Sequence, residues 1–253
     1  MSLLYQEIKR SYRAPLVIFV LAAVIMFGLK SRIGIFESST VFDVLIFVLP
    51  LSACIASFAV SKRYGRSKVF GRSYFLLGCG FFATFLGEFL YFLYGTALEE
   101  SVLDLFDNLF LVSFVFTAAH MIINIRYFAE RFEFYQKAIL AFLPVFIVAA
   151  YSYLVYLNSL ELNYGFFFNL VFVCAAAINL GLVVVGFSLF RHTVLFSAWF
   201  LLLVGFFIGT LGDLEYRYYN TFGADFLGNN STVFWLTSFM ILVYALYKHQ
   251  KSM

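Results

Sequence analysis

The chain has 253 residues, of which 63% are apolar and only 12% are charged, with 17 basic and 14 acidic side chains. So few charges cannot cover the surface of a soluble domain of this size, and the composition therefore indicates an integral membrane protein. At about 20 residues per membrane-spanning helix, seven or eight spans use almost the whole chain, which excludes a soluble kinase, cyclase or nuclease domain. We expect no nucleic-acid partner.

The apolar stretches, taken in chain order, are separated by short charged or polar segments. The first follows the basic residues Lys9, Arg10 and Arg13 and has no convincing cleavage site, so we expect it to be retained as a helix. The eight predicted membrane-spanning helices are residues 14–29, 41–61, 73–95, 105–125, 138–157, 165–190, 194–214 and 231–247. The predicted fold class is all-α, a polytopic membrane protein with eight transmembrane helices.

The basic residues gather on one side of the predicted spans. With the N-terminus placed in the cytoplasm, 14 of the 17 Lys and Arg residues lie on the cytoplasmic side, and only Lys30, Arg32 and Arg217 lie outside. Cytoplasmic loops are enriched in Lys and Arg, so the sequence predicts a multi-pass protein of the plasma membrane with both termini in the cytoplasm. Eleven of the 14 acidic residues fall on the opposite side, which predicts an acidic outer face.

An internal repeat relates the two halves of the chain. Residues 80–114 align without a gap with residues 205–239, with 11 identities in 35 positions, and Gly87-Glu88 aligns with Gly212-Asp213. Each half contains an even number of predicted helices, so the two halves should have the same topology. We therefore predict two four-helix repeats, residues 1–130 and 131–253, in one membrane domain.

Glu88 and Asp213 are the main candidates for a functional site. Each follows a glycine after about 15 apolar residues of its predicted helix, and a carboxylate at that depth costs a few kcal/mol unless it faces protein or water. In one interpretation the two carboxylates form a paired site that binds a cation, shares a proton or acts on a substrate. In the other they bond separately to Tyr, Ser or backbone groups between helices. The sequence identifies neither a metal nor a cofactor.

Four further residues are predicted to support this site. Tyr91 and Tyr216 lie at interfacial depth, where aromatic side chains also form a belt at the membrane surface. Asp107 either favours the dipole at the start of its helix or reaches the cavity near Glu88. His120 either joins a hydrogen-bonded cluster between helices or serves as a proton relay or ligand contact.

The motifs around the two carboxyl groups resemble a family of membrane sensors. The first motif reads Gly87-Glu88-x-x-Tyr91-x-x-Tyr94, followed by Ser101-x-x-Asp104 and Asp107-x-Leu-Phe. It resembles the multi-helix sensor modules that precede histidine-kinase or diguanylate-cyclase domains in archaea and bacteria, and Gly212-Asp213 with residues 236–247 looks like the second half of such a module. Since no output domain follows Met253, the resemblance implies a stand-alone module.

A fainter similarity is to the lysoplasmalogenase-like eight-helix family. A Gly-Asp in its third helix, an Ala-His in its fourth and an acid in its seventh resemble Gly87-Glu88, Ala119-His120 and Asp213. The acid of the third helix is Glu here, which departs from the family pattern. The similarity implies an intramembrane hydrolase acting on a lipid head group, with the two carboxylates activating water and His120 assisting.

Two hypotheses follow, and they differ on whether the protein is an enzyme. The leading hypothesis is a non-enzymatic sensor-type or accessory module, whose acidic, outward-facing cavity at Glu88 and Asp213 binds a cation or small ligand and which acts through a membrane partner. The alternative is the lipid hydrolase. Besides the bilayer we expect a protein partner or a homo-oligomer on outward Phe faces, with the glycines of residues 80–87 and 205–212 forming the central contact of the two halves.

Overall fold

The computed structural model describes residues 17–18, 20, 40–65, 67–94, 100–157, 164–191, 193–222 and 231–251. The described residues form seven long α-helices and no strands. The helices are α2 (Thr40–Tyr64), α3 (Phe70–Tyr94), α4 (Glu100–Phe128), α5 (Phe134–Leu157), α6 (Tyr164–Phe190), α7 (Phe196–Phe222) and α8 (Ser231–Lys251). Each is long and apolar enough to cross a membrane. Helices suit that environment because they satisfy their own backbone hydrogen bonds.

The prediction of eight helices in two four-helix repeats is wrong. The described residues contain seven candidate spans, three before residue 130 and four after it, so two equal halves of four helices are not found. The helix predicted at residues 14–29 lies largely outside the described residues. The other predicted spans coincide with the seven helices, most of which begin or end a few residues beyond the apolar stretch, because a helix continues into its polar flanks while its backbone bonds are satisfied.

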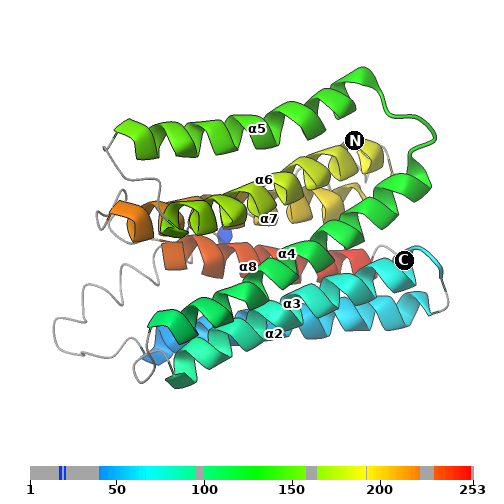
Figure 1. Cartoon of the computed structure of the whole chain (residues 1–253). Helices are drawn as coiled ribbons and strands as arrows, with labels where there is room; N and C mark the ends of the chain where they lie inside the picture. The colour runs from blue at the N-terminus through cyan, green and yellow to red at the C-terminus, as the bar shows by residue number, and fades with distance from the viewer. Residues whose placement is uncertain are drawn as a thin grey trace.

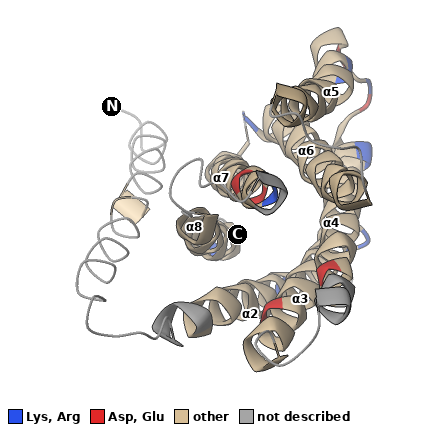
Figure 2. Cartoon of the chain, turned by 60° about the vertical axis from the view of Figure 1, so that its left-hand side comes forward, with Lys and Arg blue, Asp and Glu red and all other residues tan. Residues whose placement is uncertain are grey.

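Six of the helices form a closed ring in the order α2, α3, α4, α6, α7 and α8, with α8 packed against α2 (Figure 1). α5 lies outside the ring and packs mainly on α6. Figure 2 shows the same arrangement viewed more nearly along the helix axes. In this view α7 and α8 face an arc made by α2, α3, α4 and α6. In this arrangement α3 and α7 are not neighbours.

Glycines allow close approach within the ring, but between partners that differ from the predicted ones. A Cβ atom on Gly80 of α3 would lie 3.1 Å from the Ser113 carbonyl oxygen of α4, and one on Gly205 of α7 would lie 2.8 Å from Leu242 of α8. The prediction that these glycines join the two halves is therefore wrong. Each glycine instead faces the helix that follows it in the chain, because that helix returns beside it.

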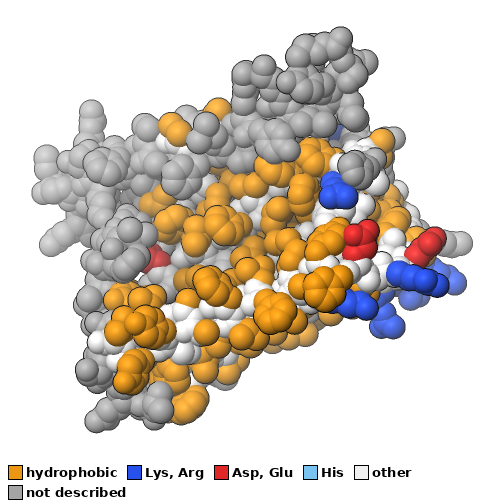
Figure 3. Space-filling model, turned by 90° about the horizontal axis from the view of Figure 1, so that it is seen from above, with side chains coloured by type: hydrophobic (Ala, Val, Ile, Leu, Met, Phe, Trp, Pro, Cys, Tyr) orange, Lys and Arg blue, Asp and Glu red, His pale blue; other side chains and the backbone are white. Residues whose placement is uncertain are grey.

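The surface of the bundle fits contact with a lipid bilayer. Most aromatic side chains of α5 are exposed, among them Phe134 at 86% and Phe146 at 71%. Figure 3 shows hydrophobic side chains spread over the visible face, with Lys and Arg side chains gathered at one end. Seven apolar helices with this surface describe a multi-pass integral membrane protein.

Candidate functional site

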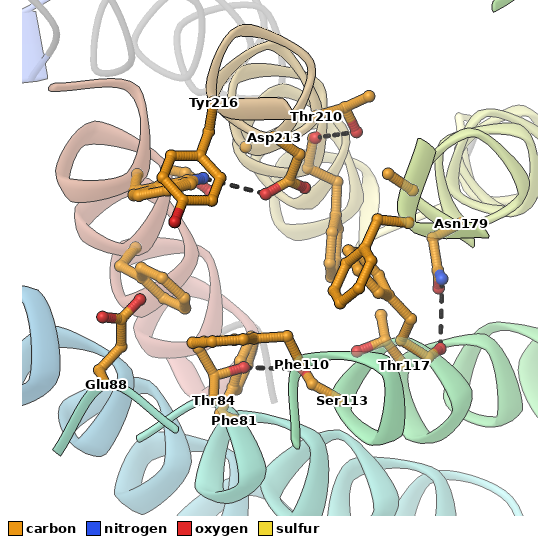
Figure 4. A pocket seen from close by; sticks show the side chains of 18 of the residues that line it. Phe81, Thr84, Glu88, Phe110, Ser113, Thr117, Asn179, Thr210, Asp213 and Tyr216 are labelled. Atoms are coloured by element: carbon orange, nitrogen blue, oxygen red, sulfur yellow. Dashed lines mark hydrogen bonds between the residues drawn. The ribbon is translucent and has the colours of Figure 1, made fainter. Parts of the chain in front are cut away.

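A cavity of about 500 Å³ is lined by residues of all six ring helices and by none from α5 (Figure 4). Its volume is typical of small-molecule sites, and its walls are largely aromatic and aliphatic. Threonine and serine hydroxyls and one asparagine interrupt the apolar lining. The charged residues that line it are Glu88, Asp107, Asp213 and Arg217.

The structure places five of the six predicted site residues around this cavity. Glu88 and Tyr91 come from α3, Asp107 from α4, and Asp213 and Tyr216 from α7. The two principal carboxyl groups therefore reach one common space although α3 and α7 are not in contact. In Figure 4 the Glu88 side chain lies on one side of this space, and those of Asp213 and Tyr216 lie on the opposite side, on α7.

Asp107 is the centre of a buried polar network. The Tyr91 hydroxyl donates to its Oδ1 at 2.7 Å, and Arg217 Nη1 donates to its Oδ2 at 2.9 Å and to Asn169 Oδ1 at 3.2 Å. The Arg217 guanidinium also lies 3.7 Å above the centre of the Phe172 ring. This network connects α3, α4, α6 and α7. Since both charges of the ion pair are buried, removing either one is expected to cost about 3 to 5 kcal/mol.

Arg217 is the functional residue that the sequence reasoning missed. It was assigned to the outer side as a topological charge, but its side chain is buried, with 6% exposure. The signal that could have found it is its position four residues after Asp213, on the same helical face and inside an apolar helix. An ionisable residue at such a depth usually has a specific partner.

The two principal carboxyl groups differ in how they are satisfied. Asp213 Oδ1 accepts a hydrogen bond from Trp235 Nε1 at 3.0 Å, and Gly212 allows the indole this close, since a Cβ there would lie 2.9 Å from it. Glu88 is half-buried, faces the cavity and has no hydrogen bond or ion pair with any residue that the structure describes. Glu88 is therefore the charged group of this cavity that is free to meet a ligand.

Asn179 adds a second open acceptor on the α6 wall. Its Nδ2 donates to the carbonyl oxygens of Phe114 at 3.2 Å and Ala175 at 3.0 Å, which fixes the orientation of the amide. Its Oδ1 is buried and has no partner within the described part of the chain. On the α3–α4 wall, Thr84 Oγ1 donates to Ser113 Oγ at 2.8 Å.

His120 lies away from the cavity. It is completely buried between the rings of Tyr74, at a centroid distance of 4.7 Å, and Trp199, at 6.1 Å with the planes nearly parallel. Neither ring nitrogen has a hydrogen-bond partner among the described residues. His249 lies in the same cluster, with its ring nitrogens 2.7 Å from the Tyr64 hydroxyl and 3.1 Å from that of Tyr74. His120 thus belongs to an aromatic packing cluster and not to the cavity lining.

Comparisons with known proteins give this chain no relatives. A scan against protein-family models, a search of curated proteins and a search of solved structures each found no match. The chemistry of the cavity therefore has to be inferred from its own residues.

Proposed function

We propose that this protein is a non-enzymatic membrane module of the sensor or accessory type, whose cavity binds a cation or small ligand at Glu88 and Asp213. The observation that carries the proposal is the Glu88 carboxyl group, which faces the cavity without a partner among the described residues while Asp107 and Arg217 neutralise each other. An unpaired carboxylate in a membrane-spanning helix costs free energy unless protein, water or a ligand surrounds it. The resemblance of the Gly87-Glu88 motif to sensor modules agrees with this role.

The orientation of the module follows from its charges. Lys and Arg residues cluster at the end of the bundle where α2, α4 and α6 end, and the predicted positive-inside arrangement places that end in the cytoplasm. The cavity carboxylates lie toward the opposite ends of α3 and α7, so in this orientation the ligand enters from outside the cell. The C-terminal end of α8 is then cytoplasmic, whereas α2 begins on the outer side.

The position of the cavity allows ligand binding to change the helix arrangement that a membrane partner contacts. Its walls come from every helix of the ring, so a ligand that draws Glu88 and Asp213 together would shift α3 against α7. The exposed rings of α5, such as Phe142 and Phe146, offer a surface for that partner or for a second copy. Mass measurement in a mild detergent tests this part, with a strictly monomeric particle and no co-purifying subunit as the contrary result.

The binding proposal is tested with the double variant Glu88→Gln/Asp213→Asn. Thermal unfolding of the purified protein is measured against alkali and divalent cations, amines and short-chain lipids, since a ligand at 100 times its Kd stabilises the folded state by about 2.7 kcal/mol. We expect at least one of these ligands to stabilise the wild type and to lose its effect in the double variant. A matched variant, Glu130→Gln/Glu133→Gln, removes the same charge at exposed positions and should respond like the wild type. An unchanged ligand profile in the Glu88/Asp213 variant would refute the proposal.

A second candidate function is the lipid hydrolase, favoured by the fact that Glu88 and Asp213 line the same cavity. Acid–base hydrolysis requires one protonated and one ionised carboxyl group near the scissile bond. The proposed assistance by His120 is not supported, because His120 lies in the aromatic cluster with Tyr74 and Trp199. Release of head groups from a panel of lysolipids by the purified protein tests this function, and no release from any member rejects it.

A further inference from the structure

Aromatic rings make up a large share of the wall around the two carboxyl groups. Ten of the 24 lining residues are Phe, Tyr or Trp, about twice the aromatic share of 22% in the whole chain. Among them, Tyr216 and Trp235 contact each other at a centroid distance of 5.2 Å beside Asp213, and Tyr91 and Phe110 stack at 6.3 Å beside Glu88. The carboxyl groups therefore lie among aromatic rings, whose faces attract cations.

The charge balance of the cavity calls for a positively charged occupant. Asp107 and Arg217 form an ion pair, which leaves Glu88 and Asp213 as the acidic residues of the lining that make no ion pair within the described part of the chain. The cavity wall already shows how a cation is held in this environment, because the Arg217 guanidinium lies 3.7 Å above the Phe172 ring while it binds a carboxylate. A ligand that combines contact with a carboxylate and contact with ring faces would repeat that arrangement.

The same residues do not suit a bare metal ion. Within the described parts of the chain, no group of three or more His, Cys, Asp and Glu side chains is placed to hold a metal. Glu88 and Asp213 come from helices that are not neighbours, and a cavity of about 500 Å³ is far larger than a dehydrated ion. Calcium requires six to eight oxygen ligands, which ring faces cannot supply.

We propose that the cavity binds an organic ammonium ion, with its charge at the carboxylates of Glu88 and Asp213 and its carbon atoms against the aromatic walls. This inference rests on the proposed binding function and names the chemical class of the ligand. The Asn179 Oδ1 atom, buried and without a described partner, gives an N–H or O–H of the ligand, where it has one, a further acceptor on the α6 wall. The ammonium group can belong to a free amine or to the head group of a phospholipid.

The proposal is tested by titration calorimetry of the full chain in dodecyl maltoside, a detergent without charged groups. The probes are choline and its uncharged isostere 3,3-dimethyl-1-butanol, which differ in charge but hardly in shape. Potassium and calcium chloride serve as the metal arm. Mixed micelles with phosphatidylcholine or phosphatidylglycerol form the lipid arm, because only the first of these lipids carries an ammonium group.

We expect choline, or phosphatidylcholine in the lipid arm, to bind at least tenfold more tightly than its counterpart without the ammonium charge. Glu88→Gln should remove this preference, and because Glu88 has no described partner the variant should keep the melting temperature of the wild type. Tyr216→Leu should weaken ammonium binding, whereas Tyr216→Phe, which keeps the ring, should not. Binding of free choline assigns a soluble amine, and binding of phosphatidylcholine alone assigns a lipid head group.

Four results would overturn the inference. Equal affinity for choline and its uncharged isostere would remove the role of charge, and equal binding by Tyr216→Leu and Tyr216→Phe would remove the role of the ring. Carboxylate-dependent binding of potassium or calcium without binding of either ammonium probe would leave the proposed binding function standing and reject only the ligand class. No carboxylate-dependent binding in any arm would reject both proposals.

Discussion

The hairpins α3–α4 and α7–α8 lie on different sides of the ring and share a set of contacts at positions 125 residues apart. Gly80 of the first faces the Ser113 carbonyl oxygen, and Gly205 of the second faces the Ser238 carbonyl oxygen. Three residues after each acid, a tyrosine contacts an aromatic ring of the partner helix. The correspondence extends over these two helices of each half and gives no support to four-helix repeats.

The hairpins differ at the aromatic residue that covers the glycine before each acid. In α3–α4 it is Phe110, whose ring has no donor, and Glu88 has no hydrogen-bond partner among the described residues. In α7–α8 it is Trp235, whose Nε1 donates to Asp213 at 3.0 Å. One hairpin therefore holds its carboxyl group in place while the other leaves it open.

A second difference concerns the position four residues after each acid. The α3–α4 hairpin has Phe92 there, whereas the α7–α8 hairpin has Arg217, which reaches across the ring to Asp107 of α4. The two hairpins pack similarly. The positions that differ, Phe110 against Trp235 and Phe92 against Arg217, determine which charges are paired. Small differences on a shared scaffold thus distinguish a fixed acid from an available one.

The largest expected effect follows from removing the ion pair between Arg217 and Asp107, which joins the two hairpins. Arg217→Met or Asp107→Asn alone should destabilise the protein by about 3 to 5 kcal/mol, because each leaves a buried group without its counter-charge. Chemical unfolding in a mild detergent measures this. The double variant should recover most of the loss, since no isolated charge remains. Single variants within about 1 kcal/mol of the wild type would contradict the assignment of a buried ion pair.

Alanine substitutions at two glycines test whether the two hairpins are packed alike, with a smaller expected loss of stability. A Cβ atom on Gly87 or Gly212 would lie 2.9 Å from Phe110 or Trp235, so Gly87→Ala and Gly212→Ala should each cost about 1 to 3 kcal/mol through overpacking. Gly181 is the control, because a Cβ there would make an ordinary contact at 3.7 Å with Pro144.

Unfolding in detergent again measures the outcome. We expect Gly181→Ala to differ from the wild type by less than about 0.5 kcal/mol, or to be more stable, because alanine is the better helix former. A loss in only one of the two hairpins would show that their packing is not equivalent.

Of the eight predicted spans, seven coincide with helices of the structure, and the carboxyl groups lie in the helices predicted to carry them, because membrane insertion constrains those features directly along the sequence. Glu88 and Asp213 were found for that reason, since an acid inside an apolar helix is conspicuous. The pairing of Arg217 with Asp107 could not be predicted, because these residues are 110 positions apart and meet only through the order of helices in the ring. The expected contact between α3 and α7 is wrong for the same reason. A hydropathy pattern does not show which side of an apolar helix packs against which neighbour.

The helix count and the role of His120 show the same limit. A repeat of 35 aligned residues was extended to whole halves, but the matching contacts cover only two helices in each half. His120 was assigned a supporting role from its place in an apolar helix. Its surroundings, Tyr74 from α3 and Trp199 from α7, depend on tertiary packing and make it part of an aromatic cluster.

The smallest expected effect comes from exchanging the aromatic residue that distinguishes the hairpins. Trp235→Phe removes the donor to Asp213 while keeping a ring against Gly212, so it should cost only about 0.6 to 1.7 kcal/mol, the range of hydrogen bonds between membrane helices. The reverse change, Phe110→Trp, places an indole N–H on the wall beside Glu88. It should weaken carboxylate-dependent ligand binding by occupying Glu88, whereas Phe110→Leu, which adds no donor, should leave the acid open. Isothermal titration of the three variants measures the difference. If Phe110→Trp binds the ligand as the wild type does, the partner of Glu88 does not control access to the cavity, and the contrast between a fixed and an open carboxyl group has no functional consequence.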